Sequence, residues 1–212
     1  MRSNSTSSLQ DHQAIALAGK ILGSLFYYEP NHAAVSMIYP IWENQDWLNE
    51  WPSGELGQLQ PIAELMQQGL HFEDESLNRA FQRLFIGPNS LKAPPWGSVY
   101  LDHENVIFGE STLELFQWQK GLGIAVELQQ REPEDHIGLL LMQAAWLVEN
   151  QPEQLNVLLE QHLLPWSKRY LELFVEHAAH PFYQGLGQLT QITLQDWQVR
   201  LGIEPVKKQI YY

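Results

Sequence analysis

Apolar residues recur every three to four positions along most of this 212-residue chain, and this helical period constrains the fold more than any other feature. From Asp11 onward, for example, apolar residues keep helical spacing until Pro30, so Asp11 is expected to cap a helix that ends before this proline. Strand patterns are sparse, because only residues 98–101 and 105–108 look extended. The sequence therefore predicts an all-α fold, a single globular bundle of about 8–11 helices.

Prolines and capping residues indicate where further helices begin. Residues 31–50 are expected to contain one or two short helices, and another helix runs from Asp74 until Gly87-Pro88 stops it. Ser111 and Glu114 have the spacing of a capping box, which predicts a helix from Thr112 to about Lys120. Proline in the first turn predicts helices from Pro61 to Gln68, Pro133 to about Asn150, Pro152 to Gln161 and Pro165 to about Ala179, and a last helix is expected from about Phe182 to Leu201.

The domain organisation is expected to be simple. No internal repeat or long linker divides the chain, so residues 10–212 are predicted to form a single all-helical domain behind a flexible N-terminal tail, residues 1–9. The segment around residues 86–110 lacks a helical period and is long for a connection. Because it is rich in aromatic and aliphatic residues, we expect one long ordered loop that packs against the helices.

Charge and composition exclude several classes of function. With 12 basic against 25 acidic residues, the formal net charge is −13, which disfavours nucleic acid and anionic lipid and favours a basic partner. Solubility alone is the competing explanation of this charge. The absence of cysteine excludes disulfides and thiolate-bound metals. Residues 1–10 lack the apolar centre of a signal peptide, and no apolar run approaches the roughly 20 residues of a membrane helix, so an integral membrane protein is not expected.

The segment Glu132-Pro133-Glu134-Asp135-His136 has two interpretations. In the first, its carboxylates lie in the first turn of a helix, where they meet the positive end of the helix dipole. In the second, Glu132, Asp135 and His136 form an acidic rim of a cleft, where Asp135 receives an arginine guanidinium. A catalytic variant has Asp135 orienting His136 as a general base, but no serine, cysteine or second histidine lies beside the pair at motif spacing. The eight histidines are scattered, so neither a metal site nor a catalytic site is predicted.

A proline-rich segment and an aromatic helix end offer apolar surface. Pro95, Trp96, Gly97 and Ser98 follow Pro94, and they form either a plug that fills the core or a wall of a peptide-binding groove. Leu84-Phe85 likewise belongs either to the core or to the groove, since aromatics at helical spacing suit both.

Several ordered motifs resemble those of one family, the TorD/DmsD redox-enzyme maturation chaperones, and in particular its dimethyl sulfoxide reductase branch. The resemblance covers nearly the whole chain apart from its two ends. The motifs lie at residues 22–28, 83–88, 94–102, 108–112, 132–136, 162–166 and 180–183.

The resemblance implies a cytoplasmic chaperone that is not an enzyme. Such a chaperone binds the twin-arginine leader of the catalytic subunit of dimethyl sulfoxide reductase, holds it during cofactor insertion and folding, and then passes the reductase to the twin-arginine translocase. Translocase components are therefore further candidate partners, and a monomer is expected. The implied leader-binding residues are Leu84, Phe85, Pro95, Trp96, Pro133, Asp135 and His136, with Gly97, Ser98 and Glu132 in support.

Two alternatives to leader binding remain at the level of sequence. Some relatives are reported to bind guanine nucleotide, but this chain lacks the G-x-x-x-x-G-K-[ST] loop, and no cofactor is expected. A small nucleotide-binding or hydrolytic enzyme using Asp135 and His136 is the competing function, and an assembly module that binds only the mature reductase is a third.

Overall fold

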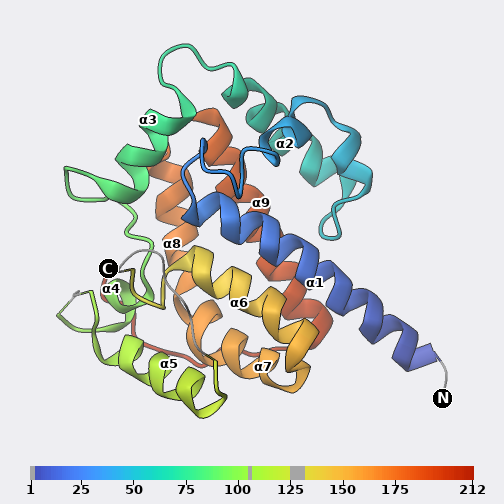
Figure 1. The fold of residues 1–212 in the computed structure, drawn as a ribbon, viewed down its shortest axis with the longest axis vertical. Helices are drawn as coiled ribbons and strands as arrows, with labels where there is room; N and C mark the ends of the chain where they lie inside the picture. The colour runs from blue at the N-terminus through green and yellow to red at the C-terminus, as the bar shows by residue number, and fades with distance from the viewer. Residues whose placement is uncertain (1–2, 105–106, 125–131) are drawn as a thin grey trace.

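Helices make up the regular structure of the part of the chain that the computed structural model describes, residues 3–104, 107–124 and 132–212 (Figure 1). The α-helices are α1 (Ser3–Tyr27), α2 (Leu56–Leu70), α3 (Leu77–Phe81), α4 (Gly97–Leu101), α5 (Glu110–Gly121), α6 (Ile137–Asn150), α7 (Leu155–Val157), α8 (Leu164–His177) and α9 (Pro181–Leu201). Short 3-10 helices cover Tyr39–Glu43, Asp46–Asn49 and Pro152–Gln154, and π-helical turns cover Gln82–Ile86 and Leu158–Leu163. The predicted all-α class is confirmed.

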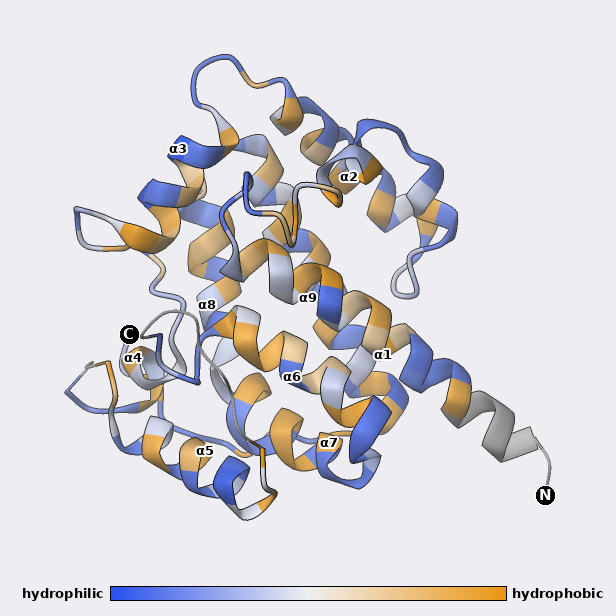
Figure 2. Ribbon diagram, in the orientation of Figure 1, coloured by the Kyte–Doolittle hydropathy of each residue, from blue (hydrophilic) through white to orange (hydrophobic). Residues whose placement is uncertain are grey.

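The long helix α1 packs against α6, and the two run side by side in Figure 1. Glycines allow their backbones to approach closely, because a Cβ atom at Gly23 would lie 2.6 Å from the carbonyl oxygen of Gly138. Most of α6 is buried, and its apolar character is visible as orange ribbon in Figure 2. This contact fixes the end of α1 beside the start of α6, where the candidate site lies.

A second set of contacts joins α2 and α8 to α9 and completes the core. Aromatic side chains fill the space between α1, α8 and the turn after α3. Phe26, Phe85 and Phe174 lie with ring centroids 5.4 to 6.0 Å apart, in tilted and edge-to-face arrangements. Such packing anchors one wall of the site to the centre of the molecule.

Two predicted helix starts are wrong by more than a turn. Asp11 lies inside α1 rather than at its N-cap, since the helical backbone already begins at Ser3. Pro61 lies in the interior of α2, which begins at Leu56 because Glu55 and Gln58 form a capping box one turn earlier. The mobility of the tail over residues 1–9 stays a prediction.

Three further predictions about local structure are wrong. Ser111 does not cap α5, because its backbone N–H and hydroxyl both donate to the Asp102 carboxylate and Gly109 takes the N-cap position. Pro133 does not open α6, whose N-cap is His136. Residues 98–101, expected to be extended, form α4 instead, and residues 105–106 of the other expected strand lie outside the described residues.

Other elements agree with the sequence. Short helices occur within residues 31–50, Pro152 and Pro165 open helical segments as predicted, and the last helix runs from Pro181 to Leu201. The helix predicted from Asp74 begins at Leu77, with Ser76 as its N-cap, and its π-helical extension ends at Gly87. Within the described ranges, no helix is long and apolar enough to cross a membrane.

Candidate functional site

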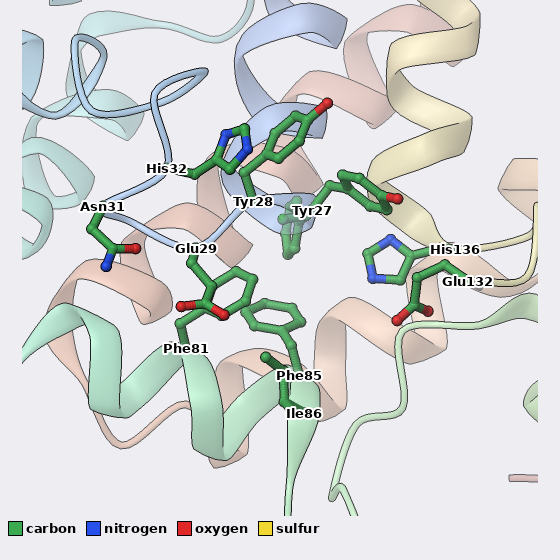
Figure 3. A pocket seen from close by; sticks show the side chains of 11 residues that line it. Tyr27, Tyr28, Glu29, Asn31, His32, Phe81, Phe85, Ile86, Glu132 and His136 are labelled. Carbon is green, nitrogen blue, oxygen red and sulfur yellow. The ribbon is translucent and has the colours of Figure 1, made fainter. Parts of the chain in front are cut away.

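A cavity of about 380 Å³ lies where the C-terminal end of α1, the turn after α3 and the segment before α6 meet (Figure 3). Its volume falls in the usual range of ligand pockets, roughly 300–1,000 Å³. Phenyl rings from Phe26, Phe81 and Phe85 form its apolar part, and polar side chains surround them. The remaining lining residues are Tyr27, Tyr28, Glu29, Asn31, His32, Ile86, Glu132 and His136.

One wall of this cavity rests on pairing between two loops. Residues 95–97 run antiparallel to residues 135–137: Ile137 N–H donates to the Pro95 carbonyl at 2.8 Å, and Gly97 N–H donates to the Asp135 carbonyl at 3.1 Å. Gly97 also packs on Trp166, since a Cβ atom at this position would lie 2.8 Å from the indole nitrogen. The predicted proline-rich wall and the predicted acidic rim are therefore one connected unit.

Asp135 lies behind this wall and is only 4% exposed. Its Oδ2 atom accepts hydrogen bonds from the Ser98 backbone N–H at 2.6 Å and from the Thr112 hydroxyl at 3.1 Å. Burial raises the pKa of the Asp135 carboxyl, and these hydrogen bonds act in the opposite direction. In this geometry Asp135 positions the start of α4 and holds α5 against it, and its carboxylate does not face the cavity.

His136 is also 4% exposed and caps α6 through its ring, because Nδ1 accepts the Gly138 backbone N–H at 3.0 Å. The ring meets Tyr27 edge to face at 5.6 Å and Trp96 at 6.3 Å. Burial lowers the pKa of His136 to about 3, so the imidazole is neutral at physiological pH. It offers the cavity an uncharged aromatic edge.

Glu132 is the acidic residue of the predicted rim that does reach the cavity. Its Oε2 atom accepts the Trp96 indole N–H at 2.9 Å, which ties the partly exposed Trp96 to the rim. Burial raises the pKa of Glu132, the hydrogen bond from Trp96 lowers it, and the nearby Asp135 carboxylate raises it.

Leu84 and Phe85 lie on the π-helical turn that extends α3. Both are buried, so the interpretation of these two residues as core is correct, yet Phe85 also lines the cavity. Such π-helical turns often occur at functional sites, where the extra residue redirects side chains. Here the turn directs Phe85 between the core and the cavity.

The structure brings together only part of the predicted set at the cavity surface. Phe85, Glu132 and His136 line the cavity, whereas Leu84, Pro95, Gly97, Ser98, Pro133 and Asp135 are buried around it and Trp96 contacts its rim. Their role in leader binding stays a prediction. The sequence alone did not assign α1 and the loop after it to the site, although the aromatic-acidic run Tyr27-Tyr28-Glu29 directly before Pro30 was a usable signal. His32, after that proline, and Phe81, on α3, also line the cavity without having been predicted.

The hydrolytic alternative needs Asp135 to orient His136, and this contact is not formed. The Asp135 Oδ2 atom is bonded to Ser98 and Thr112, while the His136 Nδ1 atom is bonded to the backbone of Gly138. In the described ranges, no group of three or more histidine and acidic side chains is arranged to hold a metal ion. The arrangement is chemically suited to binding, with aromatic faces and carboxylates around one cavity.

Fold and cavity together define an all-helical binding protein. Residues 49–172 match the family model described as "Nitrate reductase delta subunit". The "Tat proofreading chaperone DmsD" of Salmonella typhi is 47% identical over 197 residues, which are 92% of this chain and 95% of that protein. The "Probable Tat proofreading chaperone DmsD" of Haemophilus influenzae is 44% identical, covering 94% of this chain and 97% of its own. The "Chaperone protein YcdY" of Escherichia coli is 27% identical, covering 81% and 87%. The chain belongs to the TorD/DmsD family of redox-enzyme maturation chaperones.

Proposed function

We propose that this protein is a cytoplasmic, monomeric chaperone that binds the twin-arginine leader of the catalytic subunit of a dimethyl sulfoxide reductase. Binding keeps the leader from the translocase until the molybdenum cofactor is inserted and the subunit is folded. The reductase is then released toward the twin-arginine translocase. No covalent step and no nucleotide are needed, because sequestering a peptide requires only a surface that binds it.

The observation that carries this proposal is the cavity between α1, α3 and α6. A twin-arginine leader joins a basic pair to an apolar stretch, and the cavity offers carboxylates beside phenyl rings. The net charge of −13 adds long-range attraction for a basic peptide. The family relationship supports the same partner, because two relatives are named as proofreading chaperones for the Tat route.

The experiment compares the full reductase precursor with the same subunit lacking its leader, each titrated against the purified chaperone. We expect tight binding of the precursor and at least tenfold weaker binding of the leaderless subunit. Equal affinities would move the contact to the mature reductase and contradict leader recognition. Light scattering of the free chaperone and of the complex measures the stoichiometry, and a one-to-one complex is expected.

A further inference from the structure

Two carboxylates enter the candidate cavity from opposite sides. Glu29 comes from the loop after α1 and Glu132 from the segment before α6, and Figure 3 shows them on either side of the Phe81 and Phe85 rings. No lysine or arginine lines this cavity in the described residues. The cavity therefore has two negative walls and an aromatic floor.

Neither carboxylate is fully satisfied by the protein. In the parts of the chain that are described, Glu29 makes no side-chain hydrogen bond or ion pair, and Glu132 uses only Oε2, for the Trp96 indole. A partly buried carboxylate without a cation is disfavoured, and the burial that raises the pKa of Glu132 is the sign of that cost. A bound cation would relieve it.

The aromatic lining favours a guanidinium over other cations. A planar guanidinium stacks on aromatic faces and pairs with a carboxylate through two parallel hydrogen bonds, which an ammonium does not do. Phe81 and Phe85 place their rings between the two carboxylates, and the Tyr27 ring lies against His136 on the Glu132 side. The aromatic rings therefore lie within the same cavity as both carboxylates, as a bound arginine side chain requires.

We infer that Glu29 and Glu132 each receive one guanidinium of two consecutive arginines, and that the peptide is extended at this pair. The geometric reason is that successive side chains of an extended chain point to opposite faces, so adjacent arginines reach opposite walls. In a helix, neighbouring side chains are separated by about 100° and would not oppose each other in this way. This assignment rests on the proposed function and replaces Asp135 by Glu29 as an arginine-binding residue.

The neighbouring cavity differs from the first in the charge of its lining. It has a volume of about 510 Å³, and Glu29 and Asn31 line both cavities. Arg79 and Arg83 line it, and Arg83 is already paired with Glu75. These guanidinium groups make the second cavity less suited to the arginine pair than the first. Amide side chains suited to an uncharged peptide backbone complete its lining: Asn31, Asn78, Gln82 and Asn89.

The test combines variants of the chaperone with variants of the leader peptide in double-mutant cycles. Glu29→Gln and Glu132→Gln remove one charge each, and glutamine at position 132 still accepts the Trp96 hydrogen bond. Glu134→Gln is the matched control, because it removes the same charge from the same segment outside the cavity. Each chaperone is titrated with leaders carrying both arginines, either arginine alone with alanine at the other position, or two alanines, and melting temperatures are recorded.

We expect Glu29→Gln and Glu132→Gln each to weaken binding of the two-arginine leader about tenfold, and Glu134→Gln less than twofold. The affinity of each cavity variant should not change when the arginine that its missing carboxylate would bind is replaced by alanine. This arginine should differ between Glu29→Gln and Glu132→Gln. This assignment would be overturned if both cavity variants bound the two-arginine leader as tightly as the unaltered protein while the unaltered protein bound the two-alanine leader only weakly. The proposed function would remain intact. Equal binding of the two-arginine and two-alanine leaders to the unaltered protein would overturn both.

Discussion

Acid destabilisation through His136 is the prediction that the structure specifies most closely. The imidazole is buried and neutral, with a pKa near 3 in the folded protein against 6.5 for the free side chain. Between these two values the unfolded state binds a proton that the folded state does not. Stability therefore falls as pH drops below about 6.5, and above that pH the residue makes no titration-dependent contribution.

The magnitude follows from the size of this pH window. At pH 5 the solution is about 1.5 pH units below the unfolded-state pKa of His136, so protonation lowers the free energy of the unfolded state. Relative to pH 7.5, this costs the folded protein about 2 kcal/mol of stability. His162 has a pKa lowered to about 4, again mainly by burial, and it contributes in the same direction. A matched variant is needed to separate the two, and His136→Asn retains an acceptor at the α6 N-cap without a titrating ring.

The assay is urea unfolding of the parent and of His136→Asn at pH 7.5 and pH 5, followed by far-ultraviolet circular dichroism. Lost packing against Tyr27 lowers the stability of the variant at both pH values and cancels in the difference. We expect the loss between pH 7.5 and pH 5 to be about 2 kcal/mol smaller in the variant. The same loss in both proteins would refute the claim that a buried neutral imidazole caps α6.

Three further predictions concern the wall, the core and the charge. Asp135→Ala leaves two donors without an acceptor, so we expect the unfolding free energy to fall by about 1–3 kcal/mol and leader binding to weaken. Asp135→Asn keeps an acceptor, so calorimetry should show a smaller loss of stability and titration a smaller loss of leader affinity. Gly69→Ala would overlap the backbone of Phe182 and should cost about 1–3 kcal/mol in urea unfolding, while Gly57→Ala in the same helix meets open space and should cost nothing. Leader affinity should fall when ionic strength rises from low to physiological, and an affinity independent of salt would contradict electrostatic attraction.

Helix identity could be predicted from periodicity, but several helix starts could not. The helix starts at Pro152 and Pro165 depend on local chemistry, because a residue in the first turn of a helix has no intrahelical acceptor for the backbone N–H that proline lacks. Both predicted starts are confirmed. The predicted starts at Ser111 and Pro133 failed because distant groups intervene. Ser111 bonds to Asp102, and the residues after Pro133 pair with the loop at residues 95–97. Such contacts exist only after folding, so no local pattern records them.

In the candidate site, too, some residues could be predicted from the sequence and others depend on tertiary packing. Glu132 and His136 were singled out from sequence and do line the cavity, whereas Asp135, one residue from His136, is turned away from it. The sequence does not mark Glu29 as a site residue, because it follows an ordinary amphipathic helix and only the packing of α1 against α6 brings it opposite Glu132. The burial of Asp135 had no signature in the sequence, because first-turn and rim carboxylates have the same residue pattern.

The most direct test of leader recognition is calorimetric titration of the purified protein with a synthetic dimethyl sulfoxide reductase leader and with the same peptide carrying alanine at both arginines. We expect tight binding of the first peptide and affinity at least tenfold lower for the second. Binding of neither peptide, or equal binding of both, would contradict the claim that this cavity recognises a twin-arginine leader.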